Sequence, residues 1–378
     1  MLDKAKNRGT PRPYLRNINV RWFDFDLSDL LEMPFLDEES ARFTAVRGDV
    51  LICEGGYPGR AAIWNEDYPI HFQKAIHRVR FHEQERNRWF LYFIYYLETT
   101  GQLRQYYTGT GIQHFTGEAL ARLPVPIPPI AEQRRIVGIL DEAFDGIANA
   151  KANAEKNLQN ARALFERYLE AVFTRRGEGW VKKRLGEVAK TQYGLSEPMN
   201  EEGKGFKIFR MGELQDGRLM DTGRMKFADI ERAEFEKYKL QPGDVLFNRT
   251  NSFELVGKTG IFALPGDYCF ASYLVRVLLN PKTMIPEFLN YFMSSGQFQS
   301  SVKRKASRSI NQANINATIL SNEMIRFPES LELQDSIVRQ LDSLRGETRR
   351  LESIYRQKLA ALDELKKSLL HRAFCGQL

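Results

Sequence analysis

The 378-residue sequence has few cysteines and few histidines. Its three cysteines, Cys53, Cys269 and Cys375, are odd in number and far apart, so neither a disulfide framework nor a paired-cysteine metal site is predicted. The five histidines show no metal-ligand spacing either. This composition is typical of a reduced environment, and we expect a cytoplasmic protein.

The sequence also lacks long hydrophobic runs. Residues 1–12 are polar and basic, unlike a signal peptide. The most apolar run, 89–97, is too short to cross a bilayer. The remaining composition is that of a globular protein, with 43% hydrophobic and 27% charged residues. The net charge of +7 permits a nucleic-acid partner without demonstrating one.

Catalytic motifs are missing as well. A base-flipping methyltransferase needs an Asn/Asp-Pro-Pro-aromatic tetrad, whereas residues 127–130 read Ile-Pro-Pro-Ile. The nearest approach to a phosphate-binding loop, residues 257–259, lacks the required preceding glycine. Asp244, Glu254 and Lys258 resemble a nuclease metal cluster only loosely, and turn roles explain them better. We therefore expect no catalytic, cofactor-binding or metal-binding residues in this chain.

The chain contains an internal repeat. Residues 133–141 (QRRIVGILD with the pattern Q-x-x-I-V-x-x-L-D) recur as residues 334–342, offset by 201 residues. The same offset pairs Phe173 with Phe374. Further upstream, Gly48-Asp49-Val50-Leu51 matches Gly243-Asp244-Val245-Leu246, and Phe90-Leu91 matches Phe288-Leu289. The unit is therefore a mixed, strand-rich globular part followed by a helix, and it occurs twice.

Two long helices are predicted from heptad patterns. Apolar residues recur at alternating spacings of four and three, which indicates a coiled-coil seam. Each helix would span roughly 65 Å at 1.5 Å per residue, and its simplest partner is the other helix, packed antiparallel. The predicted seam and subunit-contact residues are Ile136, Leu140, Ile147, Leu164, Tyr168, Ile337, Leu341, Leu344, Leu351, Tyr355, Leu362, Leu365 and Leu369.

Proline-rich and Arg-Gly segments mark the predicted boundaries. Residues 123–129 contain four prolines and stiffen the entry to the first helix. The predicted divisions are a first globular domain at 1–130, a first helix at 131–176, a second globular domain at 177–330 and a second helix at 331–378. The predicted fold class is α/β (α+β): two copies of a globular domain, each followed by a long helix, with the helices paired as an antiparallel coiled coil.

Several short sequence motifs, in a specific order, resemble those of one protein family. They are residues 126–137 (PIPPIAEQRRIV), Trp180 followed by 184–189 (RLGEVA), 242–246 (PGDVL) and 369–376 (LLHRAFCG). Together with the duplicated layout, they cover nearly the whole chain. The sequence resembles the specificity (S) subunit of type I restriction–modification systems, the HsdS family.

The resemblance implies two target-recognition domains, each reading one half of a split double-stranded DNA sequence. It implies that the helices set the spacing and dock two methyltransferase (M) subunits, with restriction (R) subunits joining them. S-adenosylmethionine, Mg and ATP are expected only on those partner subunits, which would form N6-methyladenine. This subunit is then a non-catalytic one.

The first unit departs from the family pattern near its start. In the second unit, 26 residues separate Trp180 from Phe206, whereas 13 residues precede Tyr14, without a Trp or Leu-Gly-Glu-Val. We therefore expect the first domain to lack its initial strand, as a truncated reading frame or a wrong start codon would cause.

DNA contact is predicted for two loop segments in each unit. Lys and Arg suit phosphates, while Arg, Asn and Gln suit base edges. The candidates in the second unit are Lys303, Arg304, Lys305, Arg308, Asn311, Gln312, Arg249, Asn251 and Lys258, and those in the first are Arg60, Gln113 and His114. The alternative for each is a solvated or structural surface residue.

Two other functions stay open at this point. A heptad stripe alone is compatible with a coiled-coil scaffold protein that does not bind DNA sequence-specifically. A self-sufficient restriction enzyme is the second alternative, although the missing motifs count against it.

Overall fold

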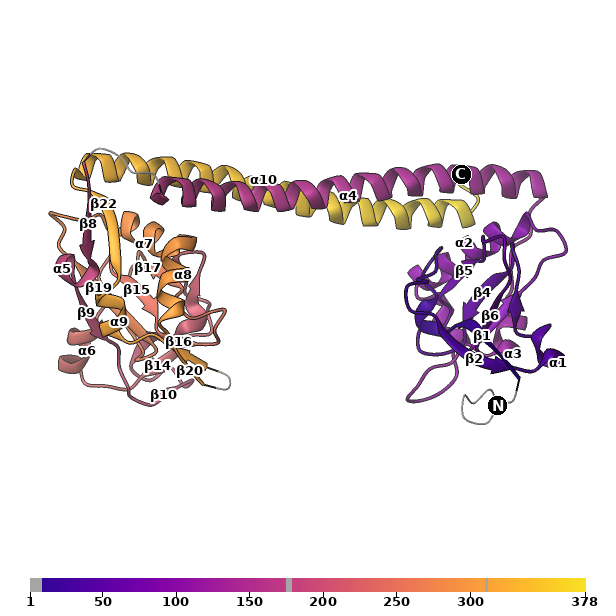
Figure 1. Ribbon diagram of the computed structural model, residues 1–378, viewed down its shortest axis with the longest axis horizontal. Coiled ribbons are helices and arrows are strands. Elements are labelled where there is room, and N and C mark those ends of the chain that lie inside the picture. The colour runs from indigo at the N-terminus through magenta and orange to yellow at the C-terminus, as the bar shows by residue number, and fades with distance from the viewer. Residues whose placement is uncertain (1–8, 175–178, 310–311) are drawn as a thin grey trace. The chain divides into compact units, whose positions relative to one another are not determined.

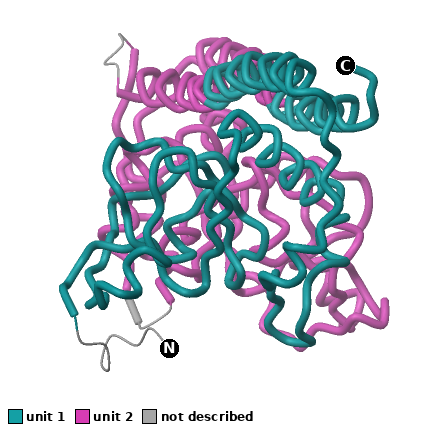
Figure 2. Tube along the Cα trace, turned by 90° about the vertical axis from the view of Figure 1, so that its right-hand side faces the viewer, with its two compact units in different colours: residues 1–155, 356–378 teal, residues 156–355 magenta. Residues whose placement is uncertain are grey.

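The computed structural model describes residues 9–174, 179–309 and 312–378 (Figure 1). The chain forms two compact units (Figure 2). Unit 1 comprises residues 1–155 and 356–378, and unit 2 comprises residues 156–355. Each unit has a mixed α/β domain and a segment of each long helix, which confirms the predicted fold class.

Unit 1 holds two small sheets with strand orders β2-β1-β6-β3 and β5-β4-β7. Strands β1 and β6 are parallel, and the other pairs are antiparallel. The strands are β1 (Thr10–Leu15), β2 (Leu31–Phe35), β3 (Thr44–Ala45), β4 (Val50–Cys53), β5 (Ala61–Ile63), β6 (Ile70–Phe72) and β7 (Ile76–Val79). The helices that begin here are α1 (Asp37–Ser40), α2 (Arg86–Thr99), α3 (Gly117–Ala121) and α4 (Ile130–Thr174).

Unit 2 repeats this plan with more strands. Its largest sheet has the order β12-β13-β17-β15-β19-β9, and β22 pairs with β8. The strands are β8 (Trp180–Arg184), β9 (Ala189–Tyr193), β10 (Met199–Asn200), β11 (Phe206–Phe209), β12 (Leu214–Gln215), β13 (Arg218–Leu219), β14 (Lys226–Ala228), β15 (Val245–Asn248), β16 (Thr250–Asn251), β17 (Thr259–Ile261), β18 (Tyr268–Phe270), β19 (Leu274–Leu279), β20 (Ser307–Ser309), β21 (Gln312–Asn314) and β22 (Met324–Pro328). The helices are α5 (Leu185–Val188), α6 (Arg232–Tyr238), α7 (Pro286–Ser294), α8 (Gly296–Arg304), α9 (Ala317–Ser321) and α10 (Leu331–Phe374).

The repeated Gly-Asp motifs form matching turns in the two units. Gly48 and Gly243 have φ angles of +91° and +93°, a conformation that favours glycine. The carboxylate of Asp49 accepts a hydrogen bond from the Val46 amide at 2.8 Å, and Asp244 accepts one from the Gln241 amide at the same distance. A fully buried strand follows each turn, β4 in unit 1 and β15 in unit 2.

The long helices pair antiparallel, as predicted. In unit 1, Lys151 Nζ lies 2.7 Å from the Asp363 carboxylate. In unit 2, Arg162 Nε lies 3.1 Å from the Glu352 carboxylate, and the Tyr168 hydroxyl lies 2.9 Å from the side chain of Gln340. Residue numbers rise along α4 while those of the partners fall along α10, so the two helices run in opposite directions.

The buried stripe departs from the predicted seam in three places. Leu164, Leu351 and Leu365 are 50%, 36% and 47% exposed, so the helix pair does not bury them. A straight α-helix drifts by about 20° per heptad from a strict seven-residue repeat, which turns some heptad positions outward. The residues actually buried are Gln133, Ile136, Leu140, Ile147, Ala154, Ala161, Leu169 and Phe173 on α4, and Gln334, Val338, Leu341, Thr348, Leu370 and Ala373 on α10.

The short buried helices α2 of unit 1 and α7 of unit 2 correspond to each other, but their equivalent residues differ by one position from the match that the sequence repeat predicts. The Tyr92 hydroxyl donates to Asp141, and the Tyr291 hydroxyl donates to Asp342, both at 2.5 Å. Since Asp141 and Asp342 are repeat partners, Tyr92 corresponds to Tyr291. The expected match of Phe90 with Phe288 is therefore wrong by one position, because the intervening loop lengths differ. Trp89 is the structural counterpart of Phe288.

Unit 2 has a covering segment that the described part of unit 1 lacks. Strand β8 pairs with β22, and β9 pairs with β19. In unit 1, β7 is the last strand of its sheet among the described residues, and residues 123–128 form no strand. The two units therefore differ where the sequence comparison expects them to differ.

Candidate nucleic-acid interface

A three-stranded sheet in unit 2 joins the two candidate DNA-binding segments. Strand β16 pairs with β21, placing Thr250 opposite Asn314 and Asn251 opposite Ala313. Strand β20 pairs with the other edge of β21. Strand β16 and the strands β20 and β21, which are about sixty residues apart in sequence, thus form one surface. Figure 1 shows β16 and β20 at the end of unit 2 that points away from α10.

Arg249 and Asn251 are held in this sheet by their own contacts. The Arg249 guanidinium donates to the Ser272 carbonyl at 3.2 Å and to Asn314 Oδ1 at 3.3 Å. It also lies 4.9 Å from the centre of the Tyr193 ring. Asn251 Oδ1 accepts from the Ser252 amide at 2.8 Å. Arg249 therefore anchors the sheet through both of its terminal guanidinium nitrogens.

The basic run after α8 divides into structural and exposed cations. Lys303 Nζ donates to the Glu254 carbonyl at 2.8 Å, and burial lowers the pKa of this lysine. Lys305 Nζ lies 2.6 Å from the carboxylate of Glu323, whose side chain is only 2% exposed. A buried carboxylate needs a charged partner, so Lys305 supports the fold. Arg304 is exposed.

An exposed lysine lies beside this run. The charge of Lys258 also acts to lower the pKa of Lys303, so the two ammonium groups are close. Lys258 is exposed, as is Gln312 at the start of β21. Asn311 and the side chain of Arg308 lie outside the described residues. Among the predicted residues of unit 2, Arg304, Lys258 and Gln312 are thus exposed in the structure.

Unit 1 also brings its two candidate segments together. The Phe115 amide donates to the Glu54 carbonyl at 2.7 Å, which ties residues 105–114 to residues 54–60. Between these segments is a cavity of about 250 Å³, and Tyr57, Arg60 and Gln113 are among its lining residues. The Arg60 guanidinium stacks 3.7 Å from the centre of the Tyr57 ring. Gln113 and His114 are exposed.

The cavity includes functional candidates that sequence reasoning missed. Tyr57 presents an exposed aromatic face, and Arg104 adds a second guanidinium to the lining. Stacking on an aromatic ring and hydrogen bonding by arginine both suit nucleic-acid bases. The neighbouring Gly56 and Pro58 are the sequence signal that could have drawn attention to Tyr57, because they hold it at a loop tip.

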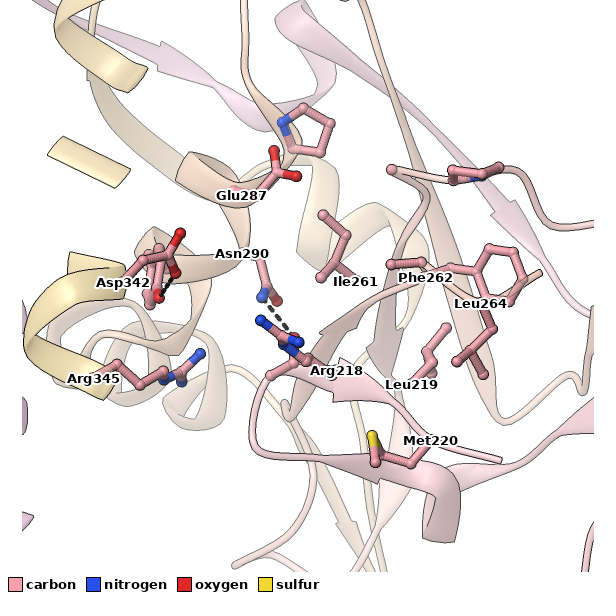
Figure 3. Close-up of a pocket in the computed structure, with 16 residues that line it drawn as sticks. Arg218, Leu219, Met220, Ile261, Phe262, Leu264, Glu287, Asn290, Asp342 and Arg345 are labelled. Carbon is pink, nitrogen blue, oxygen red and sulfur yellow. Dashed lines mark hydrogen bonds between the residues drawn. The ribbon is translucent and has the colours of Figure 1, made fainter. Parts of the chain in front are cut away.

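A pocket of about 760 Å³ lies in unit 2 between the β12–β13 hairpin, α7 and α10 (Figure 3). Asn290 Nδ2 donates to the Gly217 carbonyl at 2.8 Å. Burial raises the pKa of Tyr291 to about 12, and the hydrogen bond to Asp342 adds to this shift. Arg345 lies 5.0 Å from the rings of both Phe165 and Tyr291, and burial lowers its pKa. These contacts attach α10 to the recognition domain of unit 2.

Groups of metal ligands and membrane-spanning helices were both sought among the described residues. Across 9–174, 179–309 and 312–378, no three His, Cys, Asp or Glu side chains are grouped to hold a metal ion. Asp244, considered above as a loose metal-ligand candidate, lies 3.2 Å from the Arg276 guanidinium, and burial raises its pKa. No helix in these ranges is long and apolar enough to cross a membrane.

Comparison with known protein families identifies the architecture. The family model "Type I restriction modification DNA specificity domain" matches residues 37–158 and 177–360, and so covers both units. This chain belongs to that specificity-domain family. The family resemblance predicted from the sequence is thereby confirmed.

Individual members of the specificity-domain family resemble the chain over much of its length. The type I restriction enzyme EcoKI specificity subunit of Escherichia coli K12 is 28% identical over 285 residues, which are 71% of this chain and 61% of that protein. The chain thus spans less than two thirds of that relative. The StySPI specificity subunit of Salmonella potsdam is 23% identical, over 97% of this chain and 82% of that protein.

Solved structures show the same fold. One, described as the structural basis underlying complex assembly and conformational transition of the type I R-M system, has a TM-score of 0.78 at 22% identity. It covers all of this chain and 94% of the other. The HsdS subunit from Thermoanaerobacter tengcongensis has a TM-score of 0.63 at 23% identity, covering all of this chain and 93% of the other.

Proposed function

We propose that this chain is the DNA-sequence-recognition subunit of a type I restriction–modification enzyme, with each unit reading one half of a bipartite target. The observation that carries the proposal is the duplicated interface. In both units, two segments that are distant in sequence meet, with exposed Arg, Lys or Gln side chains. In unit 2 these segments lie on α8 and in strands β16, β20 and β21, and not in loops as the sequence predicted. Family membership supports the same function.

The exposed side chains suit two kinds of DNA contact. Lys258 and Arg304 in unit 2 provide cations for the phosphate backbone, which fixes the position on the duplex without reading sequence. Gln312 in unit 2 and Gln113 in unit 1 carry a side-chain donor and acceptor, and Arg60 in unit 1 carries paired donors, which distinguish base edges in the major groove. Sequence reading therefore requires both units.

The long helices are proposed to dock two methyltransferase subunits, which restriction subunits then join. Leu164, Leu351 and Leu365 are large apolar side chains left exposed on the helix pair, as a docking surface requires. In this proposal S-adenosylmethionine, Mg and ATP are bound by the partners. The chain itself catalyses neither methylation nor cleavage, and either activity in the chain alone would refute that part.

The test is a gel shift of the chain in complex with its methyltransferase subunit, over a pool of random duplexes. We expect selection of one bipartite sequence. A complex that assembles but binds no duplex selectively would favour the coiled-coil scaffold function instead.

A second experiment tests the placement of the interface. Lys258→Ala with Arg304→Ala removes two exposed cations, so fewer counterions are released on binding. We expect the slope of log affinity against log salt to become shallower by up to about two. The matched control is Lys237→Ala on α6, an exposed lysine elsewhere in unit 2. An unchanged slope in the double variant would refute this placement.

A third experiment tests the spacing role of the helices. Removing one heptad from α4 and the opposing heptad from α10 keeps the paired faces in phase, and shortens the pair by about 10 Å at 1.5 Å per residue. We expect the selected target to have a different number of base pairs between its half-sites. The same spacing in both proteins would contradict a ruler function.

A further inference from the structure

We propose that one exposed apolar side chain in each unit reads the 5-methyl group of a thymine in the DNA target. These two tip residues are Tyr57 in unit 1 and Leu255 in unit 2. Each lies in the segment that joins two antiparallel strands, β4 and β5 in unit 1 and β15 and β17 in unit 2. The proposal rests on the proposed recognition function, and it adds one base that each unit selects.

Matching backbone hydrogen bonds place the tip residues at equivalent positions. The Cys53 amide donates to the Arg60 carbonyl, and the Asn248 amide donates to the Lys258 carbonyl, both at 2.8 Å. The two acceptors are 198 residues apart, and so are the tip residues. The loop of unit 2 is three residues longer, but the extra residues precede Leu255 and leave its spacing to Lys258 unchanged.

Both tip residues expose apolar surface to solvent. Tyr57 is 48% exposed and Leu255 is 41% exposed, whereas strands β4, β5, β15 and β17 are buried throughout. The backbone of Leu255 is already engaged, because its amide donates to the Ser252 carbonyl at 3.1 Å and its carbonyl accepts from Asn248 Nδ2 at 3.4 Å. Contact of the side chain with an apolar group of a partner would remove this surface from water, which is favourable.

A cation three residues beyond each tip residue suits the surroundings of a DNA base. The Arg60 guanidinium lies 3.7 Å from the centre of the Tyr57 ring. Lys258 is exposed, and its charge acts to lower the pKa of the neighbouring Lys303. Because arginine and lysine bind phosphates and guanine edges, each cation would hold its tip residue at the groove.

Thymine carries the apolar group that distinguishes base pairs in the major groove. The other groups that distinguish them there are hydrogen-bond donors and acceptors. A leucine side chain has neither a donor nor an acceptor. Leu255 can therefore discriminate among bases in this groove by contact with the 5-methyl group.

In unit 1, a neighbouring amide suits the partner base of thymine. Gln113 lines the cavity of about 250 Å³ together with Tyr57. A glutamine amide matches the paired donor and acceptor that adenine presents in the major groove. The thymine opposite that adenine presents its methyl group on the same groove edge. Tyr57 and Gln113 thus suit the two bases of one A·T pair or of adjacent pairs.

The test is a double-mutant cycle between a side chain and a methyl group. The chain in complex with its methyltransferase subunit is titrated with its selected duplex. Deoxyuridine then replaces one thymine at a time, so that only the methyl group is lost. We expect at least one replacement in each half-site to weaken binding about fourfold, the effect of burying one methyl group.

Each tip residue should account for the loss in one half-site. In Leu255→Ala, the effect of the replacement in one half-site should fall below about twofold, and Tyr57→Ala should do the same for the other half-site. Because the methyl group also affects the duplex itself, comparing the same two duplexes in both proteins isolates the contact. The matched control is Met324→Ala, which should keep the full loss, since Met324 is 41% exposed but lies on β22, outside the loop.

Two outcomes would overturn the proposal and leave DNA recognition intact. One is selective binding that no deoxyuridine replacement weakens, which is measured on the unchanged protein and does not depend on how the variants fold. The other is a loss that persists undiminished in the double variant Tyr57→Ala with Leu255→Ala, because other side chains would then read the methyl groups. A complex that selects no duplex sequence would refute the recognition function, and the thymine contact with it.

Discussion

The helix pair contains a cation–aromatic contact in each unit, and the comparison of the two explains which helices pair. In unit 1, Lys366 of α10 lies 4.3 Å from the ring of Phe144 on α4. In unit 2, Arg345 of α10 lies 5.0 Å from the ring of Phe165 on α4. Phe144 and Arg345 are repeat partners, as are Phe165 and Lys366. Both rings are therefore on α4 and both cations on α10.

This distribution favours pairing of α4 with α10 over pairing of either helix with its own copy. Two copies of α10 packed antiparallel would bring the two half-buried cations together, and two copies of α4 would leave the rings without a cation. Like charges that meet only in the wrong pairing are a device for specificity. The two helices are thus complementary at these positions, whereas identical helices would be free to pair in several ways.

The units also differ in what lies next to the shared Tyr–Asp hydrogen bond. In unit 1, the ring of Phe23 packs 5.1 Å from Tyr92 and 6.0 Å from Phe144. In unit 2, the corresponding hairpin tip carries Asp216 and Gly217, and the 760 Å³ pocket lies beside it. The recognition domain of unit 1 is thus joined to the helices by aromatic packing, and that of unit 2 by polar contacts.

The largest expected effect comes from the repeat partners Phe173 and Phe374. Phe173 is fully buried, and its ring contacts Phe288 and Phe292. Phe374 packs on Trp89, Phe93 and Tyr96 but is partly exposed. Phe173→Ala should lower the free energy of unfolding of unit 2 by about 3–5 kcal/mol, the usual cost of removing a buried ring.

Phe374→Ala should cost clearly less, because solvent already reaches the side chain. Denaturant titration followed by tryptophan fluorescence measures both changes, with Trp180 reporting on unit 2. Equal losses in the two variants would show that the units do not differ in how firmly these helix ends are packed.

The Tyr–Asp hydrogen bonds give the next effect. Tyr291→Phe removes the hydroxyl that donates to Asp342, and a hydrogen bond to a charged group contributes about 1.5–3 kcal/mol. Tyr92→Phe should cost less, since Asp141 keeps the Arg88 guanidinium at 2.7 Å. Equilibrium unfolding of both variants, with Arg88→Ala added to Tyr92→Phe, tests this reason. The double change should bring the loss in unit 1 up to that in unit 2.

The helices, the turns and the duplication were predictable because each leaves a periodic or local signal. The heptad patterns of apolar residues predicted the antiparallel helix pair. The Gly48-Asp49 and Gly243-Asp244 motifs predicted the turns before β4 and β15. The difference between the described parts of the two units, in which strands β8 and β9 of unit 2 have no described counterpart in unit 1, also followed from comparing the repeats. These features depend on neighbouring residues or on spacing, which one sequence contains.

The roles of single cations were not predictable in the same way. Lys303, Arg304 and Lys305 look alike in sequence, yet two of them hydrogen-bond to groups that the chain supplies from residues 254 and 323. Arg249 likewise meets Ser272 and Asn314 only after folding. The exposed positions of Leu164, Leu351 and Leu365 depend on how a helix rotates over several heptads, which a strict seven-residue pattern ignores.

A smaller effect is expected at Glu323, whose counterpart in unit 1 is Leu123, also buried. Lys305→Ala removes a half-exposed ammonium group from beside the buried Glu323 carboxylate. Because solvent screens this ion pair, the free energy of unfolding should fall by only about 1 kcal/mol. Adding Glu323→Leu should recover stability, because unit 1 tolerates leucine there and a buried ion pair is often replaceable by apolar residues. Thermal unfolding of the single and double variants measures this, and Arg304→Ala is the matched surface control. A double variant less stable than Lys305→Ala would contradict this equivalence of the units.

The smallest effect is a difference in pH dependence. His71 pairs with Tyr14 across β6 and β1, and the matching register in unit 2 places Cys269 at its position. Burial lowers the pKa of His71 below 6.5, with a smaller contribution from Arg12, and its Nε2 lies 2.9 Å from the Ser40 hydroxyl. Above pH 6.5 the ring is neutral whether unit 1 is folded or unfolded, so the stability is complete. As the pH falls below 6.5, the unfolded chain takes up the proton first and unit 1 loses stability, until the lowered pKa of the folded state is passed.

Unit 2 contains no histidine between residues 156 and 355, and burial raises the pKa of Cys269 to about 12, so this thiol stays neutral throughout. Unfolding midpoints from pH 7.5 to 5.5 should therefore fall for unit 1 more than for unit 2, and His71→Cys should reduce the fall in unit 1, whatever its effect on absolute stability. A pH dependence unchanged by His71→Cys would assign the difference between the units to other groups.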